Sequence, residues 1–192
     1  MPKKIKILKK LIAISIIFSL SACGFQVVYK DQSLSTSLSY ELAAIRIKKD
    51  RTELSQQLRN NLYDVLNPDH IKASSKYFLI LKLTQSSSPT FITATGASGR
   101  NKITLSVNYE LRNAENMQEI TKGIVEISDN YDVSLNRFGT YVSQNYVENN
   151  LTKLISQNIR NSLVNDLVEL QKRCDDLKNS KEEDSVCYFV ND

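Results

Sequence analysis

One cysteine near the start of the chain stands where its thiol could be chemically modified. Cys23 follows the small residues Ser21 and Ala22, precedes Gly24, and comes directly after a short apolar stretch. The thiolate of cysteine is a strong nucleophile, and small neighbours leave room for the enzymes that would alkylate it and cleave before it. This pattern indicates covalent attachment of lipid at Cys23.

The residues before Cys23 have the parts of a secretory signal peptide. Five lysines lie within the first ten residues, and an apolar run follows over residues 11–20. That run is too short to span the ~30 Å hydrocarbon core of a bilayer, which takes about 20 residues. Leu20-Ser21-Ala22-Cys23 resembles a bacterial lipobox, so we expect residues 1–22 to be removed and Cys23 to carry S-diacylglycerol and N-palmitoyl groups. The alternative is an ordinary signal peptide followed by an unmodified cysteine.

Removal of the signal changes the charge of the chain. Five of the 25 basic residues and none of the 21 acidic ones lie in residues 1–22, so 20 basic residues face 21 acidic ones in the mature protein. The formal charge of +4 therefore gives no argument for nucleic-acid binding. The remaining length suits one domain. We expect a lipidated N-terminus and tether over residues 23–41, a single domain over 42–173 and a charged, mobile tail over 174–192.

Two further cysteines lie in that expected tail. Cys174 and Cys187 are separated by twelve residues. In an oxidising compartment outside the cytoplasm, they could form a disulfide that stabilises the fold by about 3 kcal/mol, the value for a ~15-residue loop. The alternative is a pair of free thiols in a disordered tail.

The first half of the domain reads as strand, helix, strand. Residues 42–47 read as a strand after a polar loop or tether at 32–39. Asp50 and Glu53 then form a capping-box pattern. The leucine stripe 54, 58, 62 and 66 predicts an amphipathic helix that Pro68 ends. The apolar run 77–83 predicts a strand near the middle of the sheet and covered on both faces.

The second half reads as strands followed by a long helix. The residues Ser86 to Pro89 should end the preceding strand. A separate strand should follow at 91–95, and then a loop at 96–101. Residues 103–111 alternate apolar and polar, which predicts a strand with one dry face. A turn at 113–116 leads to a return strand at 119–131, where Gly123 could mark a bulge. Asn136 to Gly139 should form a loop, and the spacing from about Tyr141 to Leu170 predicts a long helix.

Together these elements predict an α+β fold. We expect a two-layer sandwich with two amphipathic helices packed on one face of a four- to five-stranded, mostly antiparallel or mixed sheet, because this arrangement buries every apolar stripe.

The sequence shows no catalytic constellation. The single histidine, His70, follows a helix-ending proline, where a lone histidine is usually a solvated surface residue. No cluster of cysteine and histidine has metal-ligand spacing, and the glycines at 96 and 99 lack the lysine of a phosphate-binding loop. We therefore expect a protein that is not an enzyme and that needs no cofactor.

In its order of parts the chain resembles the LptE family of lipopolysaccharide-assembly lipoproteins. The resemblance rests on Cys23-Gly24-Phe25, the run Thr93 to Arg100, the alternating strand with its hairpin return, Ser128 to Asp132 and the closing helix. It covers about residues 20–170 and looks like the alphaproteobacterial branch. It implies a protein at the outer membrane that plugs the LptD-type β-barrel and binds lipopolysaccharide. Gly24 fits that location, since it is not the Asp that resembles an inner-membrane retention signal.

The same resemblance implies basic residues that contact lipopolysaccharide. Arg100 and Lys102 lie in the matching inter-strand loop, and Arg137 precedes the last helix. The arginine guanidinium can bind a phosphate through two hydrogen bonds. The alternative is that these are solvated loop charges. A second interpretation of the whole chain is an outer-membrane scaffold or assembly adaptor that binds protein partners and no glycolipid.

Overall fold

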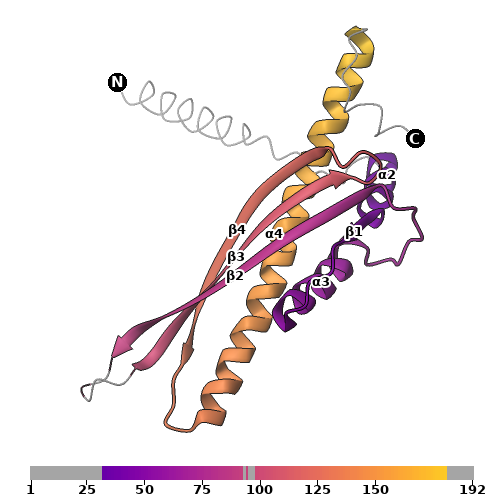
Figure 1. Cartoon of the computed structure of the whole chain (residues 1–192). Coiled ribbons are helices and arrows are strands. Elements are labelled where there is room, and N and C mark those ends of the chain that lie inside the picture. The colour runs from indigo at the N-terminus through magenta and orange to yellow at the C-terminus, as the bar shows by residue number, and fades with distance from the viewer. Residues whose placement is uncertain (1–31, 93, 95–97, 181–192) are drawn as a thin grey trace, which may run out of the picture. The chain divides into compact units, whose positions relative to one another are not determined.

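The computed structural model describes residues 32–92, 94 and 98–180 (Figure 1). The described elements are α2 (Gln32–Ala43), β1 (Ile45–Ile47), α3 (Glu53–Leu66), β2 (Tyr77–Ile92), β3 (Ser98–Asn113), β4 (Glu119–Asp132) and α4 (Arg137–Ser180). The described residues from Thr36 onward belong to one compact unit. Among these residues, no helix has the length and hydropathy needed to cross a membrane.

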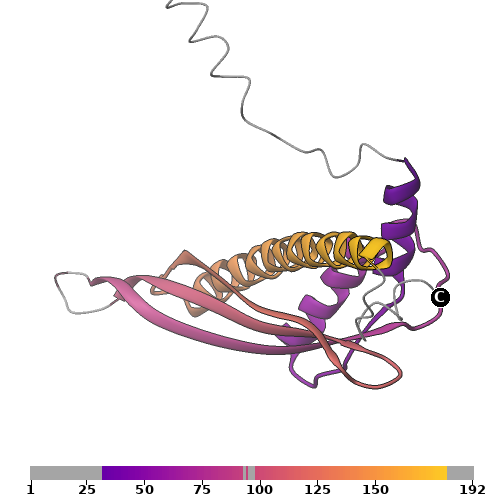
Figure 2. The same ribbon diagram turned by 90° about the horizontal axis from the view of Figure 1, so that it is seen from above.

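The four strands form one mixed sheet in the order β1-β2-β3-β4. β1 pairs with β2 in parallel, whereas β2, β3 and β4 are antiparallel neighbours. α4 runs along one face of the sheet and packs against α3 (Figures 1 and 2). This is the expected α+β sandwich with helices on one face of a mixed sheet.

The predicted alternation of β3 is confirmed. Its odd-numbered apolar side chains face the helices and form the centre of the core, because successive side chains of a strand point to opposite faces. The buried residues of β3 are Ile103, Leu105, Val107, Tyr109 and Leu111. The predicted turn also forms, since Asn113 Oδ1 accepts hydrogen bonds from the backbone N–H groups of Glu115 and Asn116.

β2 differs from the prediction in length and in burial. The residues Ser86 to Pro89 do not break the strand, which continues to Ile92 with register shifts on either side of Phe91. Beyond Leu79 the outer edge of β2 has no partner among the described residues, so a proline is tolerated there. β2 does lie between β1 and β3, but only one of its faces is covered, and Phe78 on the other face is 36% exposed.

α3 has the expected length and core face, but a different cap. Leu58, Leu62 and Leu66 are buried. The N-cap is Thr52, whose hydroxyl accepts a hydrogen bond from the backbone N–H of Ser55 at 3.3 Å. Asp50 instead accepts from the backbone N–H of Arg51 and lies before the helix. The predicted capping box at Asp50 is therefore wrong.

α4 is longer than predicted at both ends. It begins at Arg137, so the expected loop over 136–139 is mostly helix, with Asn136 Oδ1 accepting from the backbone N–H of Phe138. It ends at Ser180, well inside the expected mobile tail. Cys174 is buried because it lies seven residues after the buried Leu167 and so continues the same helical stripe.

The segment before β1 is helical and not a polar loop. α2 covers Gln32–Ala43, so the strand begins only at Ile45, and Leu38 and Leu42 are buried. Glu41 fixes this helix to the start of β2. Its carboxylate accepts a hydrogen bond from the Tyr77 hydroxyl (2.6 Å) and pairs with Lys76 Nζ (3.4 Å). Burial, followed by the bond to Glu41, raises the pKa of Tyr77, so this hydroxyl stays protonated and donates.

Gly123 has a packing role in place of the predicted bulge. It pairs with Tyr109, and a Cβ built on Gly123 would lie 2.5 Å from the Tyr109 hydroxyl oxygen. We expect Gly123→Ala to lower the free energy of unfolding by about 1–3 kcal/mol, because the buried ring must move. Denaturant titration measures the change. The register shift between β3 and β4 lies instead between Leu111 and Arg112.

Gly139 provides the matched control. A Cβ there would lie 3.5 Å from Ser134 Oγ, an ordinary contact, and Gly139 is in α4. Gly139→Ala should raise the free energy of unfolding by up to about 1 kcal/mol, since alanine favours helix. Equal effects of the two alanines would contradict the role assigned to the Tyr109 ring.

Candidate functional site

The face of the sheet turned away from α4, which we call the open face, is mostly polar, and no described helix covers it. Its side chains alternate along each strand with the core residues. The open face comprises Phe78, Ile80, Lys82, Thr84, Ser86 and Ser88 of β2, Lys102, Thr104, Ser106, Asn108, Glu110 and Arg112 of β3, and Lys122, Ile124, Glu126, Ser128 and Asn130 of β4. The predicted wet face of β3 is thus extended by its two neighbours into a polar surface.

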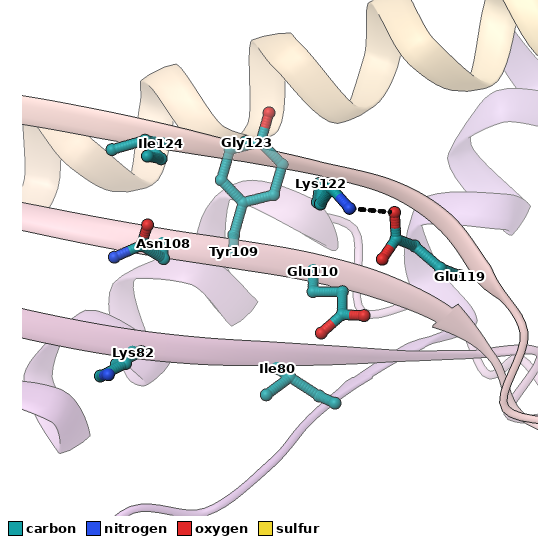
Figure 3. A pocket seen from close by; sticks show the side chains of 9 residues that line it. All are labelled: Ile80, Lys82, Asn108, Tyr109, Glu110, Glu119, Lys122, Gly123 and Ile124. Carbon is teal, nitrogen blue, oxygen red and sulfur yellow. Dashed lines mark ion pairs between the residues drawn. The ribbon is translucent and has the colours of Figure 1, made fainter.

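A shallow groove of about 600 Å³ lies on this face (Figure 3). Its charged groups are largely paired. Lys122 Nζ lies 2.9 Å from Glu119 Oε1, and Arg112 lies 2.6 Å from Glu110 Oε1. The hydrogen bond from Lys122 lowers the pKa of Glu119, and the same pair raises the pKa of Lys122. Lys82 lines the same groove without an ion pair to any described residue, so the groove presents paired charges and one further cation. Within the described residues, no group of three histidine, cysteine or acidic side chains could hold a metal.

The three candidate basic residues lie at one end of the sheet. Arg100 and Lys102 belong to the start of β3 and not to a loop, because the strand already begins at Ser98. Arg100 Nε lies 2.9 Å from Asp132 Oδ1 at the end of β4, with both side chains more than half exposed. Arg100 is therefore partly neutralised.

Lys102 and Arg137 differ from Arg100 in having no ion pair with any described residue. Lys102 is exposed opposite Asn130 on the open face, and Arg137 is exposed at the first position of α4. Two hydrogen bonds bring the two strands and the helix together at this end. Val133 N–H donates to Gly99 O at 3.1 Å, and Asp132 N–H donates to Ser143 Oγ at 3.3 Å. We call this region the basic end.

The first turns of α4 expose apolar side chains at the basic end, a feature that the sequence reasoning missed. From Val147 onward most apolar residues of α4 are buried, with Leu154 exposed, but those before Val147 face away from the fold. The exposed set consists of Leu135, Phe138, Tyr141, Val142 and Tyr146. Polar residues of the same turns face the sheet instead, as Ser143 does by accepting a hydrogen bond from the backbone N–H of Asp132. The sequence does contain a signal for this feature. At helical spacing, the apolar residues of 138–146 lie on a different face of the helix from the apolar stripe that starts at Val147.

The opposite end of the sheet is where the chain enters. Tyr77, which binds Glu41 of α2, pairs with Asn113 at the far end of β3 from Arg100. The basic end and the α2 end are therefore separated by the full length of β3.

Solved structures share this architecture. A putative lipoprotein from Caulobacter crescentus CB15 is similar with a TM-score of 0.58 and 19% sequence identity, over 68% of this chain and 95% of that one. Rare lipoprotein B from Shewanella oneidensis is similar with a TM-score of 0.52 and 16% identity, over 66% of this chain and 96% of that one. The chain shares its fold with rare lipoprotein B. No protein-family model matches the chain, and no curated protein matches it in sequence.

The lipoprotein B fold covers about two thirds of this chain, and Cys174 lies near the C-terminal end of its last helix. Cys174 is 1% exposed and disulfide-bonded, and the other two cysteines, Cys23 and Cys187, lie outside the described residues. Because we expect Cys23 to be acylated, we propose Cys187 as the partner of Cys174.

Cys187→Ala tests this pairing. The variant should lose about 3 kcal/mol of unfolding free energy. It should also contain one thiol that reacts only after unfolding, because Cys174 is buried. Thiol labelling before and after denaturation counts the thiols that react in the native and in the unfolded protein. Two thiols that label rapidly in the native wild-type protein would exclude the Cys174–Cys187 bond.

Proposed function

We propose that this protein is an outer-membrane lipoprotein that binds lipopolysaccharide and plugs an LptD-type β-barrel. In this role it is not an enzyme. It is anchored by the acylated Cys23 after removal of residues 1–22, and it faces the periplasm with its anchored end. The shared fold with rare lipoprotein B and the lipobox-like sequence support a lipoprotein.

The observation that carries the plugging role is the open face. The interior of a large transmembrane barrel is polar, so a plug should present polar side chains to it. The open face offers this surface across three strands. Hydroxyl groups stand side by side in its middle, since Ser86 pairs with Thr104 and Thr104 pairs with Ser128. Two pairs of opposite charge in the groove, Lys122 with Glu119 and Arg112 with Glu110, neutralise each other, so the barrel wall need not supply counter-charges to these four side chains.

The length of the sheet suits the same role. β3 has 16 residues, which span about 50 Å at ~3.3 Å per residue. A bilayer with its headgroups is about 40–45 Å thick. Cys23 precedes α2 by nine residues, so an acyl anchor is tied to the α2 end. The basic end can then lie near the opposite surface of the membrane.

The basic end is the proposed site for lipopolysaccharide. Its phosphates are anionic, and charge-assisted hydrogen bonds from arginine or lysine are the strong ones. Lys102 and Arg137 have the greater capacity for such contacts, because Arg100 already pairs with Asp132. We therefore propose Lys102 and Arg137 as the main phosphate contacts and Arg100 as a weaker one.

Affinity purification of the acylated protein from cell envelopes tests the proposal. We expect a large barrel protein in about equal amount, together with lipopolysaccharide. Recovery of barrel-assembly or cell-wall proteins without glycolipid would overturn it and support the adaptor role. The open face favours that second function too, since a scaffold also needs a polar docking surface.

A further inference from the structure

The start of α4 exposes an apolar face. From Val147 onward most apolar side chains of α4 are buried, and the helix packs against the sheet and α3. In the turns before Val147 the apolar side chains instead point away from the fold. We call the four side chains Phe138, Tyr141, Val142 and Tyr146 the outward face. Clustered exposed apolar and aromatic side chains of this kind mark binding sites on soluble proteins.

The outward orientation of these apolar side chains is stabilised by hydrogen bonds, which join the opposite side of the same turns to the sheet. Ser143 Oγ accepts from the backbone N–H of Asp132. Glu148 Oε1 accepts from Gln85 Nε2 of β2 at 2.7 Å and from Gln144 Nε2 at 2.8 Å. Rotating the helix to bury the outward face would break these bonds. These bonds therefore keep the outward face exposed on the surface of the protein.

Positive charge borders the outward face. Arg137 is the residue directly before Phe138, and the first turn of α4 contains no acidic side chain. The N-terminus of a helix has a partial positive charge of its own. Lys102 on β3 adds another exposed cation at the same end of the sheet, with no ion pair to a described residue. The surface therefore combines an apolar strip with a cationic border, which is complementary to an anionic lipid.

We propose that the outward face holds acyl chains of lipopolysaccharide, while the lipid phosphates lie at Arg137 and Lys102. This inference rests on the proposed function and adds to it a second, apolar part of the ligand site. The polar wall of a barrel lumen does not match the face. Tyrosine side chains favour the boundary between acyl chains and headgroups, and the outward face has two, Tyr141 and Tyr146.

Site-specific photo-crosslinking in cells tests the proposal with the full acylated chain. A photoreactive phenylalanine analogue replaces Phe138, Tyr141 or Val142 in turn, and immunoblotting detects covalent adducts with lipopolysaccharide. Leu154 is the matched control, because it is also an exposed apolar residue of α4 but lies several turns further along. We expect adducts at the outward face in several-fold higher yield than at Leu154.

A polar variant gives a second readout. Phe138→Ser with Val142→Ser should reduce the lipopolysaccharide recovered with the protein by about tenfold for each side chain that the lipid buries, without unfolding the domain, since both side chains are exposed.

The outcomes separate this inference from the function on which it rests. If the outward face crosslinks only to protein while the analogue at Lys102 or Arg137 captures lipopolysaccharide, the function stands and the inference is overturned. If none of these positions captures lipopolysaccharide, both are overturned.

Discussion

Replacing Cys23 with alanine should abolish acylation and remove the protein from the outer membrane. Without its sulfur the residue cannot form the thioether to diacylglycerol, and processing before Cys23 depends on that modification. A single acyl chain binds a bilayer only marginally, with an association constant near 10⁴ M⁻¹, whereas additional chains make anchoring stable. Loss of all chains should therefore shift nearly all of the protein out of the outer-membrane fraction.

Intact mass and membrane fractionation measure this result together. The wild-type protein should be heavier than the polypeptide of residues 23–192 by the mass of its lipid groups. Cys187→Ala is the matched control, because it also removes one thiol but leaves the lipobox intact. A wild-type mass equal to the bare polypeptide, or one that includes residues 1–22, would contradict lipidation.

The sequence predicted the parts of the fold that depend on regular spacing. The alternation in β3 and the leucine spacing in α3 place Leu105 and Leu58 in the core, and both are fully buried. Each pattern is set by the geometry of a single strand or helix, so it can be read without knowledge of neighbouring elements.

The parts that failed depend on neighbours. Pro89 looked like a break, but it lies on a strand whose outer edge pairs with no other described strand at that point, so a missing N–H costs little there. Gly123 looked like a bulge, but it makes room for Tyr109 from the adjacent strand. Neither partner can be identified until the register of the sheet is known.

The candidate site was predicted in part. The positions of Arg100, Lys102 and Arg137 followed from a resemblance, and the structure brings the elements that hold them to one end of the sheet. The ion pair between Arg100 and Asp132 was not foreseen, because the two residues are 32 positions apart and pair only across β3 and β4. Because of this pair, we expect Lys102 and Arg137 to contribute more to phosphate binding than Arg100.

Reversing the charges at Lys102 and Arg137 together should weaken lipopolysaccharide binding at least a hundredfold. A hydrogen bond to a charged group contributes about 1.5–3 kcal/mol, so the loss of two phosphate contacts is large. The acidic side chains of Lys102→Asp and Arg137→Asp would also repel the phosphates. Arg100→Asp alone should have a smaller effect, since Asp132 already holds part of that charge.

Direct binding of lipopolysaccharide to the purified acylated protein measures the effect, and thermal unfolding checks that the fold persists. Lys153→Asp with Lys172→Asp is the matched control, because both are exposed lysines of α4 and the change in net charge is the same. Lys153 lies 16 residues beyond Arg137, about 24 Å along the helix axis. At that distance salt screens most of the interaction with a phosphate bound at the basic end. Equal losses in the two double variants would mean that net charge and not this site governs binding.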